Sequence, residues 1–465
     1  MPQLLREDFT EKTDQLNAIQ SIRTQGGYSS YFIETYGCQM NENDSERLAG
    51  LLEEMGLTPV STPAEADIVM LNTCCVREKA ELKVFGNVAA LRMYKDIRPG
   101  MIIGVCGCMM QQPGVADEIL KRNPHVNFIF GTQQIQRFPS LLLRAMEEKD
   151  AFSDINVSAD TVIEHIPTTR KAGVRAWVSI MYGCNNFCSY CIVPYVRGRE
   201  RSRLPKDVLQ EVTYLVRNGY KEVSLLGQNV NSYGNGLAEE CSFPQLLQKI
   251  SEIEGLQRIR FMTSHPKDLS DALINAIAAL PKVCKHIHLP MQAGSWKTLQ
   301  RMNRKYNPNE YENLVAKLRK AVPGIAVTTD LIVGFPGETD SDFIETLKTV
   351  SRIRFDAAFT FAYSPRKGTP AAKMDKQVPE LVKKKRLAAL IALQESISAE
   401  KLADYANRTV DVLVEQVSQR DKSMVAGRTE TDKMVHFRGS VTDIGKIIPV
   451  HITQVKAHTL MGEIT

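Results

Sequence analysis

Between residues 29 and 145 the chain alternates continuous apolar runs with amphipathic stretches. The apolar runs have the length of buried strands, and the stretches between them repeat apolar residues at helical spacing. This alternation predicts a parallel sheet with helices on both faces, which is a doubly wound α/β domain. We expect strands at 31–37, 66–72, 101–107 and 126–131, and helices at 43–56, 76–94, 115–122 and 136–148.

Two polar segments flank this pattern. Residues 1–28 show no sustained periodicity, so we expect a loose N-terminal extension there. Residues 146–169 are polar and weakly patterned, which is typical of a linker between domains. The first domain is therefore predicted to span residues 29–145.

A second alternating series covers residues 170–400. Its six strand-like runs predict a partial (β/α)6 barrel, because a closed eight-fold barrel usually needs about 250 residues. A long helix near 379–405 ends the series. We expect strands at 176–183, 222–228, 258–264, 286–292, 326–335 and 357–364, and helices at 205–219, 242–253, 268–280 and 307–322.

The last segment, residues 403–465, has a different pattern. Short strand-like runs are separated by Gly and polar turns, which is typical of a small β-barrel. The whole chain is thus predicted to be α/β with three domains. Strands of the last domain are expected at 409–416, 423–429, 434–439 and 446–455.

Composition and charge narrow the class of protein only slightly. The 465 residues include 58 Lys and Arg against 53 Asp and Glu, and a net charge of +5 permits a nucleic-acid partner without requiring one. The chain has no run of about 18 uncharged apolar residues, and its N-terminus lacks the apolar segment of a secretory signal. We therefore expect no membrane association and a cytoplasmic protein, whose ten cysteines are reduced thiols or metal ligands.

Three cysteines form a CxxxCxxC loop, GCNNFCSYC, directly after the first strand of the second series. Cys184, Cys188 and Cys191 therefore follow a barrel strand at its carboxyl end, where parallel α/β barrels place their chemistry. Three soft thiolates suit a 4Fe–4S cluster and leave one iron open for a chelating ligand. The alternatives are three core thiols or a partial zinc site, but the next cysteine, Cys241, is fifty residues away.

The first domain carries further cysteines at the expected ends of three strands. Cys38 follows the first strand, and the pairs Cys74–Cys75 and Cys106–Cys108 follow the next two. Doubly wound sheets bind ligands where such strand ends converge. Cys106 ends an apolar run and is assigned to the core, whereas the glycine after it lets Cys108 turn out over the sheet. Spacing alone leaves both Cys74 and Cys75 open as ligands, and buried thiols without a cluster are the alternative.

The cysteine loop, with its aromatic residues Tyr182, Phe187 and Tyr190, resembles the signature of radical S-adenosylmethionine (SAM) enzymes. The resemblance implies that the open iron chelates the amino and carboxylate groups of SAM. An electron from the cluster then cleaves SAM to methionine and a 5′-deoxyadenosyl radical, which abstracts hydrogen from an unactivated C–H bond. Such chemistry needs no acid–base or nucleophile triad, and the sequence indicates none.

From about residue 29 to residue 465 the chain is similar to the methylthiotransferase family of radical SAM enzymes. The motifs TYGCQMN, LNTCCVREKA and GCMMQQ carry the resemblance, and RGRERSR, LLGQNVNSYG, DLIVGFPGET and FAYSPRKGT fit it. The three N-domain cysteines of the family map onto Cys38, Cys74 and Cys108, which implies an auxiliary 4Fe–4S cluster with an open iron. The cysteine at position 75, next to Cys74, is a departure from the pattern of many family members.

The resemblance implies insertion of a methylthio group at C2 of N6-isopentenyladenosine 37, in the anticodon stem-loop of tRNA. One SAM methylates a sulfide bound at the N-domain cluster, and a second SAM yields the radical that activates the C2–H bond. The implied partners are tRNA, a reductant such as flavodoxin or ferredoxin, and a sulfur donor that no motif identifies; we expect a monomer.

Two alternatives to this function remain. One is the same chemistry on threonylcarbamoyladenosine 37 or on an aspartate of a ribosomal protein, although the YGCQMN and RGRERSR motifs favour the isopentenyl enzyme. The other is a non-catalytic RNA-binding protein with structural or redox-sensing clusters. Two sets of three cysteines argue against it, because structural clusters are normally closed by four ligands.

Further residues are candidates for binding SAM and RNA. In radical SAM folds the later strand ends hold SAM, so Gln228, Ser264 and Asp330 are its candidate ligands, with satisfied loop residues as the alternative. The C-terminal barrel resembles the TRAM domain, a small RNA-binding barrel, through SMVAGRTETDKMVHF and GKIIPVHIT. We expect Arg428, His436 and Phe437 to be exposed there, although aromatic residues of a barrel are more often core. We also expect phosphate contacts along a basic rim, with a solvated helix face as the alternative. The rim comprises the basic residues of segments 197–206, 285–306 and 366–386.

Overall fold

The computed structural model describes residues 3–75, 78–155, 162, 164, 166–170, 173–419 and 421–465, and the chain divides into two compact units. The first unit contains Met1–Lys171, Tyr182–Asn185 and Ile192–Arg201. The second contains Ala172–Met181, Asn186–Cys191 and Ser202–Thr465. Within the described ranges, no helix is both long and apolar enough to cross a membrane.

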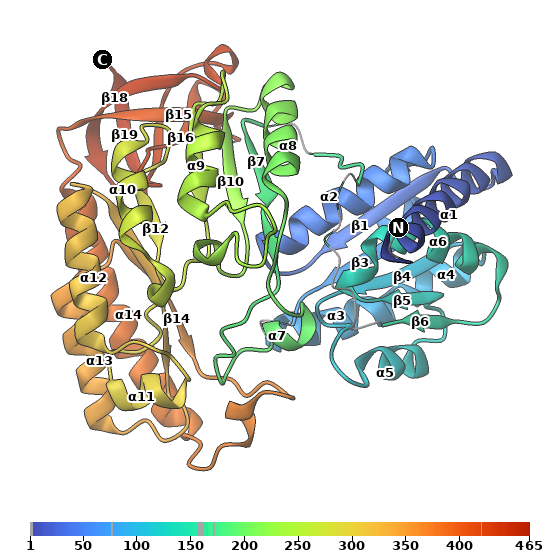
Figure 1. The fold of residues 1–465 in the computed structure, drawn as a ribbon, viewed down its shortest axis with the longest axis horizontal. Helices are drawn as coiled ribbons and strands as arrows, with labels where there is room; N and C mark the ends of the chain where they lie inside the picture. The colour runs from blue at the N-terminus through green and yellow to red at the C-terminus, as the bar shows by residue number, and fades with distance from the viewer. Residues whose placement is uncertain are drawn as a thin grey trace. The chain divides into compact units, whose positions relative to one another are not determined.

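A parallel sheet forms the centre of the first unit (Figure 1). In the described residues its six strands follow the order β2-β1-β3-β4-β5-β6, so β1, β3 and β4 are neighbours and their carboxyl ends lie at one edge. This is the expected doubly wound sheet, in which strands buried on both faces are largely apolar. The strands are β1 Ser30–Thr35, β2 Thr58–Pro59, β3 Ile68–Thr73, β4 Ile102–Gly107, β5 Phe128–Phe130 and β6 Phe152–Asp154.

Helices cover both faces of this sheet, and strand side chains alternate between two core layers. Along β4, Ile103 and Val105 lie in the layer of α3 and α5, whereas Ile102 and Cys106 lie in the layer of α2 and α6. The helix expected at 76–94 is divided into two. The helices are α2 Gln39–Glu54, α3 Glu78–Ala90, α4 Arg92–Ile97, α5 Val115–Arg122, α6 Phe138–Glu147 and α7 Val193–Val196, with short 3-10 turns at Pro63–Glu65 and Thr132–Arg137.

The N-terminal segment differs from the loose extension that its polarity predicts. It forms the helix α1 Gln3–Gln25, which packs against α6 through the buried Ala18 and Ile22 and through a hydrogen bond from Gln15 Nε2 to Ser140 Oγ of 3.1 Å. Because few apolar residues make this packing, the helix has no wide apolar stripe. Such a stripe is the pattern from which an amphipathic helix is predicted, so the sequence shows no sign of this one. The expected linker also contributes β6 at the edge of the sheet.

The second unit contains the expected partial barrel. Two three-stranded parallel sheets, β7-β10-β11 and β12-β13-β14, are linked by a bridge between Ile259 and Val283, which gives six strands in the described residues. The strands are β7 Arg175–Ser179, β10 Glu222–Leu226, β11 Arg258–Phe261, β12 His286–His288, β13 Ala326–Val333 and β14 Ala357–Ala362; the short β8 Met181–Tyr182 and β9 Arg201–Ser202 precede β10.

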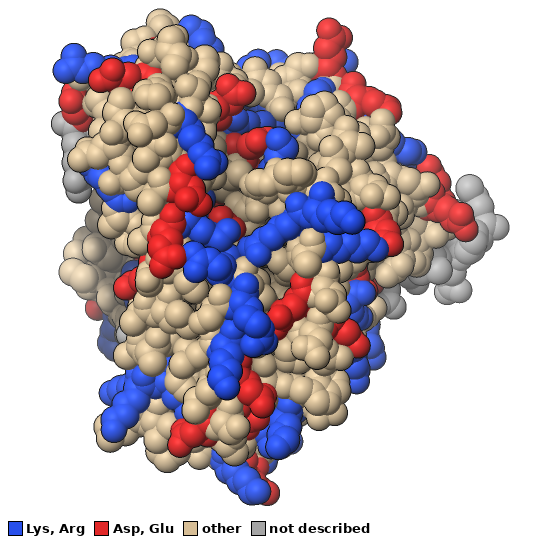
Figure 2. Space-filling view, turned by 90° about the vertical axis from the view of Figure 1, so that its left-hand side faces the viewer, with Lys and Arg blue, Asp and Glu red and all other residues tan. Residues whose placement is uncertain are grey.

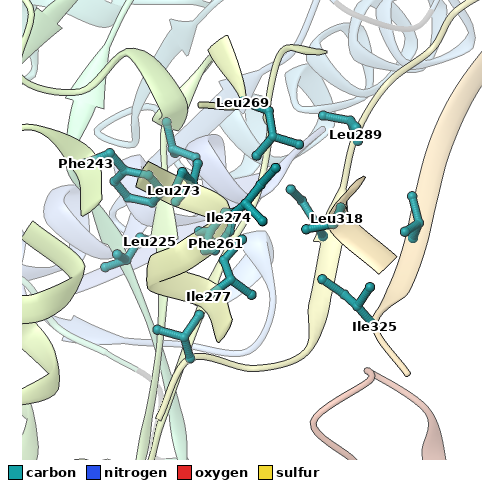
Figure 3. Packing of buried hydrophobic residues seen from close by; sticks show 14 of the residues in the cluster. Leu225, Phe243, Phe261, Leu269, Leu273, Ile274, Ile277, Leu289, Leu318 and Ile325 are labelled. Atoms are coloured by element: carbon teal, nitrogen blue, oxygen red, sulfur yellow. The ribbon is translucent and has the colours of Figure 1, made fainter. Parts of the chain in front are cut away.

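Amphipathic helices bury the outer face of the partial barrel. Figure 3 shows Leu273, Ile274 and Ile277 of α10 close to Phe261 of β11, within one continuous apolar cluster. Burial of such side chains removes apolar area from water and fixes the strand ends in place. The helices are α8 Pro205–Arg217, α9 Phe243–Ser251, α10 Asp271–Ala279, α11 Trp296–Arg301, α12 Pro308–Ala321, α13 Asp340–Ile353 and α14 Glu380–Ala403, with 3-10 turns at Val230–Ser232, Pro266–Asp268 and Pro370–Lys373.

The C-terminal segment of the second unit is a closed β-barrel in the order β15-β16-β17-β19-β18. Four of its strands lie where the sequence predicts them. The fifth, β19, pairs with both β17 and β18 and closes the barrel, but its short run gave no strand signal. The strands are β15 Thr409–Val417, β16 Met424–Arg428, β17 Met434–Arg438, β18 Ile447–Val455 and β19 Leu460–Ile464, with a 3-10 turn at Val441–Asp443.

Buried ion pairs join this barrel to the partial barrel within the second unit. The fully buried carboxylate of Glu222 lies 2.8 Å from Arg175 Nε and 2.9 Å from Arg260 Nε. Arg175 also pairs with Glu415 of β15, and Arg260 donates to the Thr429 carbonyl at 2.6 Å. Removing one side of such a network leaves buried charge uncompensated. Experiments on RNA binding therefore require the full chain rather than a truncation.

Candidate iron–sulfur and nucleic-acid sites

Four thiols of the first unit follow the adjacent strands β1, β3 and β4. Cys38 is the N-cap residue of α2, Cys74 and Cys75 follow β3, and Cys108 follows β4. Gly37, with φ of 114°, permits a close approach to Cys74: a Cβ atom on Gly37 would lie 2.6 Å from Cys74 Sγ. The fold therefore brings the three expected ligands, Cys38, Cys74 and Cys108, to one edge of the sheet.

Cys106 lies on the other face of the sheet, in the core layer of Phe128, Phe130 and Phe138. Burial raises the pKa of the Cys106 thiol well above its ordinary value. This agrees with the assignment of Cys106 to the core, because a ligand must be deprotonated and must face the site.

Cys75 lies in the same core layer as Cys74 and Cys108. A hydrogen bond with Cys108, together with burial, raises the pKa of Cys75 well above its ordinary value. The hydrogen bond from Cys75 contributes most to lowering the pKa of Cys108 to about 7, and the guanidinium of Arg197 also lowers it. Both thiols after β3 thus face the candidate site, and the expectation for Cys74 rests on the family pattern.

The basic-rim interpretation predicts that Arg197 is a solvent-exposed phosphate ligand, and this prediction is wrong. Its side chain is buried, and its Nε donates to Cys108 Sγ at 3.0 Å. Its Nη2 donates to Asn41 Oδ1 at 2.8 Å and to Asp44 Oδ2 at 3.0 Å. The prediction fails because the sequence shows how many basic residues a segment carries, but not which distant residues bury their side chains in the fold.

The CxxxCxxC loop is fixed by backbone hydrogen bonds. Cys184 N donates to the Gly198 carbonyl at 3.1 Å in the first unit, and Cys191 N donates to the Cys188 carbonyl at 2.9 Å in the second. Cys184 and Cys188 are buried and Cys191 is half-buried. In the second unit the buried Arg304 donates from Nη1 to Cys188 Sγ at 3.4 Å. The loop thus presents three thiols, one of them next to a cation.

The donor chemistry of both cysteine sets fits iron–sulfur clusters. All ten cysteines lie in the described residues, and none forms a disulfide. No three His, Cys, Asp or Glu side chains in the described ranges are gathered closely enough to hold a metal ion. The fit therefore rests on the thiol sets and on the two buried guanidinium groups that donate to their sulfurs, since cations stabilise thiolates.

The three candidate SAM ligands divide into two kinds. Gln228 and Ser264 follow β10 and β11, as expected, and Ser264 Oγ is buried without a hydrogen-bond partner in the described structure. Such an atom is typical of a ligand site. Asp330, in contrast, does not follow its strand. It is the fifth residue of β13, and its Oδ1 lies 3.5 Å from His288 Nε2.

Sequence reasoning missed Gln292, which follows β12. Its Oε1 atom is buried without a hydrogen-bond partner among the described residues, and its φ of 72° is unusual for a residue other than glycine. The HLPMQAGS run contained the signal, because it places an amide at the end of a run expected to form a strand. Gln292 thus joins Ser264 as a buried polar group beyond a strand end.

The rest of the basic rim is also partly buried. Arg203 pairs with Glu211 at 2.6 Å, and Arg386 of α14 pairs with Glu338 at 2.7 Å. Lys383 of α14 is 3% exposed, so it offers no surface charge for phosphate. Figure 2 shows Lys and Arg beside Asp and Glu across one face, which is typical of a solvated helical surface. These observations remove Arg203, Lys383 and Arg386 from the expected phosphate contacts.

The three candidate RNA contacts of the C-terminal barrel have different environments. Phe437 is fully buried among the core residues of the barrel, so the prediction that it stacks on RNA is wrong. Alternation along β17 places this aromatic ring inside, where it excludes water. Arg428 lies 3.4 Å from both Glu415 and Asp432. His436 is half-exposed, and burial lowers its pKa.

Family models match three successive parts of the chain. Residues 30–131 match a family described as uncharacterized protein family UPF0004, residues 178–350 match the radical SAM superfamily, and residues 404–465 match the TRAM domain. A solved structure of the radical SAM methyltransferase TsrM from Kitasatospora setae, with cobalamin and a [4Fe-4S] cluster bound, has a TM-score of 0.54 at 13% identity over 74% of each chain. A second TsrM structure, with tryptophan and a SAM analogue, has a TM-score of 0.54 at 14% identity over 74% of this chain and 75% of that chain. At these identities the likeness shows the fold alone.

Curated relatives match nearly the whole chain. The tRNA-2-methylthio-N(6)-dimethylallyladenosine synthase of Thermoanaerobacter pseudethanolicus is 51% identical over 458 residues, which cover 98% of this chain and 97% of the relative. The protein of the same name from Clostridium tetani is 51% identical over 448 residues, covering 96% and 98%. That from Acetivibrio thermocellus is 50% identical over 459 residues, covering 99% and 95%. The chain therefore belongs to the methylthiotransferase family of radical SAM enzymes that includes these synthases.

Proposed function

We propose that this chain adds a methylthio group at C2 of N6-isopentenyladenosine 37 in tRNA, using radical SAM chemistry. N6-isopentenyl and N(6)-dimethylallyl are two names for the same adenosine modification. The observation that carries the proposal is the presence of both cysteine sets, each with a buried cation at one sulfur, in a chain 51% identical to relatives named for this product. A single set would suffice for SAM cleavage alone.

The two cysteine sets divide the chemistry. Cys184, Cys188 and Cys191 would hold a 4Fe–4S cluster that binds SAM, and Cys38, Cys74 and Cys108 would hold an auxiliary one. When bound, the clusters supply the electron for SAM cleavage and the site of the sulfide that is methylated. Each set offers three thiolates to four irons, which leaves one coordination position for a substrate group.

Polar groups beyond the strands of the partial barrel would bind SAM. The buried Ser264 Oγ and Gln292 Oε1 lack partners within the described structure, so a ligand that hydrogen-bonds to them removes a cost of burial. Gln228 is half-buried after β10 and offers an amide to the same ligand. Asp330 points from the middle of β13 toward His288, which places it deeper along the strand than the other two candidates.

The inner face of β14 offers an aromatic surface for the prenylated base. Phe359 is 56% exposed and Phe361 is 38% exposed, while α14 packs on the outer face of this strand. Phe359 pairs in register with Asp330, Phe361 pairs with Ile332, and the Phe359 ring lies 5.9 Å from that of His288. Large exposed aromatic side chains next to a candidate active site are suited to stack on a base and to contact an isoprenoid chain.

Replacing Phe359 with alanine should lower kcat/KM for tRNA that carries N6-isopentenyladenosine by about 10- to 200-fold, the range expected for apolar pocket contacts. Reductive cleavage of SAM without tRNA should be unchanged, because Phe359 is not a member of either cysteine set. Phe359→Tyr, which keeps the aromatic ring, should recover most of the rate. Equal rates for the alanine variant and the parent on prenylated tRNA would show that this face does not bind the base.

The proposed function is tested by mass spectrometry of tRNA nucleosides from cells that lack the gene. We expect N6-isopentenyladenosine to accumulate and its 2-methylthio derivative to disappear. Restoring the parent gene should return the derivative, and restoring the Cys188→Ala variant should not. Loss of methylthio from threonylcarbamoyladenosine instead would assign the other tRNA substrate, and unchanged nucleosides in every strain would contradict a role in tRNA modification.

The chemistry also defines the partners that the enzyme needs. SAM cleavage consumes electrons, so we propose a low-potential reductant such as flavodoxin or ferredoxin. Each turnover consumes a sulfur atom, so a sulfur donor must replenish the auxiliary site. The substrate is a tRNA, and we propose that the protein acts as a monomer in the cytoplasm, where thiols stay reduced.

A further inference from the structure

Two buried guanidinium groups donate hydrogen bonds to cysteine sulfurs, one in each candidate cluster set. Arg197 Nε lies 3.0 Å from Cys108 Sγ, and Arg304 Nη1 lies 3.4 Å from Cys188 Sγ. Both arginines are 5% exposed. Arginine stays charged at any physiological pH, so each sulfur accepts from a permanently charged donor, which at Cys108 is paired with the buried carboxylate of Asp44.

Arg197 is held in place by groups that also fix the loops around the thiols. Its Nη2 donates to Asn41 Oδ1 and Asp44 Oδ2. Asn41 Nδ2 in turn donates to the carbonyls of Tyr36 at 2.9 Å and Thr73 at 2.8 Å, the segments that lead into Cys38 and Cys74. The orientation of the guanidinium is thereby coupled to the loops that carry the other two expected ligands.

Arg304 is held by a separate network in the second unit. Its Nη2 donates to the Pro290 carbonyl at 2.6 Å and its Nε donates to Tyr306 Oη at 2.8 Å. Tyr306 Oη itself donates to the Met291 carbonyl at 2.8 Å. These acceptors are neutral, so Cys188 Sγ is the acceptor that gains negative charge when the thiol ionises or binds iron.

We infer that Arg197 and Arg304 are positioning residues that each raise the reduction potential of the cluster held by their own cysteine set. The inference rests on the proposed function, because it requires a cluster at each set. Reduction adds one negative charge to a cluster, and a fixed cation hydrogen-bonded to a ligand sulfur stabilises that added charge. Two separate networks allow the two potentials to be set independently.

The test is a reductive titration of reconstituted full-length protein, followed by electron paramagnetic resonance. To isolate each cluster, the titration uses backgrounds in which the cysteines of the other set are replaced by alanine. One background keeps only Cys38, Cys74 and Cys108, which we call the Cys108 set. In it, Arg197→Gln should lower the equilibrium constant for one-electron reduction of the cluster about tenfold, which is a shift of about 59 mV to lower potential. Arg197→Lys keeps the charge and should shift the potential less.

Matched variants separate this role from simple support of the fold. Arg304→Gln should lower the potential of the other cluster by a similar amount and leave the Cys108-set cluster unchanged. Arg203→Gln also removes a buried arginine, one that donates to the Ser179 carbonyl and Glu211, and should leave both potentials unchanged. Iron content measured on the same samples should equal that of the parent.

The outcomes distinguish this inference from the proposed function. Loss of iron in Arg197→Lys and Arg197→Gln alike, or an unchanged potential with full iron content, would show that Arg197 only supports the fold. A potential that shifts equally in Arg203→Gln would also overturn the inference. If the parent protein binds no 4Fe–4S cluster at the Cys108 set, both the proposed function and this inference fail.

Discussion

Alanine at Cys184, Cys188 or Cys191 is expected to abolish reductive cleavage of SAM. The three thiolates come from one short loop, and a cluster held by two of them cannot both stay bound and keep an iron open for SAM. Cys184 and Cys188 are buried, so no solvent-exposed group replaces the missing ligand. The measurement is production of 5′-deoxyadenosine and methionine by reduced protein, with iron content determined on the same sample.

A buried cysteine outside the loop supplies the matched control. Cys241 is 3% exposed in the apolar core of the second unit, so Cys241→Ala removes a buried thiol that is not part of the loop. Full iron content and SAM cleavage are expected for this variant. Full 5′-deoxyadenosine production by any one of the three loop variants would refute the assignment of the loop as the SAM-cleaving site.

The strands and the cysteine-bearing loops were predictable because their signals are local. A run such as 68–71 is apolar because its strand is covered on both faces, and a cysteine that follows the strand must lie at the carboxyl edge of the sheet. Cys106 is assigned to the core because it ends an apolar run, whereas the glycine after it lets Cys108 turn out over the sheet. Both conclusions need only the spacing of residues along the chain.

Contacts between distant segments were not predictable from spacing. The sequence shows that residues 197–206 are rich in arginine, but only the fold shows that Arg197 reaches Cys108 and that Arg203 reaches Glu211. Phe437 was misplaced for a related reason, because in a barrel the inside and outside positions depend on the register of each strand. The weakly apolar helix α1 is stabilised by its packing on α6 rather than by its own pattern.

The auxiliary set gives the second large expected effect. Alanine at Cys38, Cys74 or Cys108 should remove about half of the bound iron, because one of two equal clusters is lost. SAM cleavage should survive, since the CxxxCxxC loop is intact, whereas methylthiolation of tRNA should vanish. The measurements are iron content, 5′-deoxyadenosine production without tRNA, and the methylthio nucleoside formed with tRNA.

Cys106 and Cys75 are the informative controls for this set. Cys106→Ala removes a thiol on the opposite face of the sheet and should keep all the iron. Cys75→Ala removes a thiol that hydrogen-bonds to Cys108 but is not the family ligand, so iron content and methylthiolation should again be retained. Because Cys74 and Cys75 share one core layer, the fold permits either to bind iron. Loss of iron in Cys75→Ala with retention in Cys74→Ala would reverse their roles and make Cys75 the third ligand beside Cys38 and Cys108.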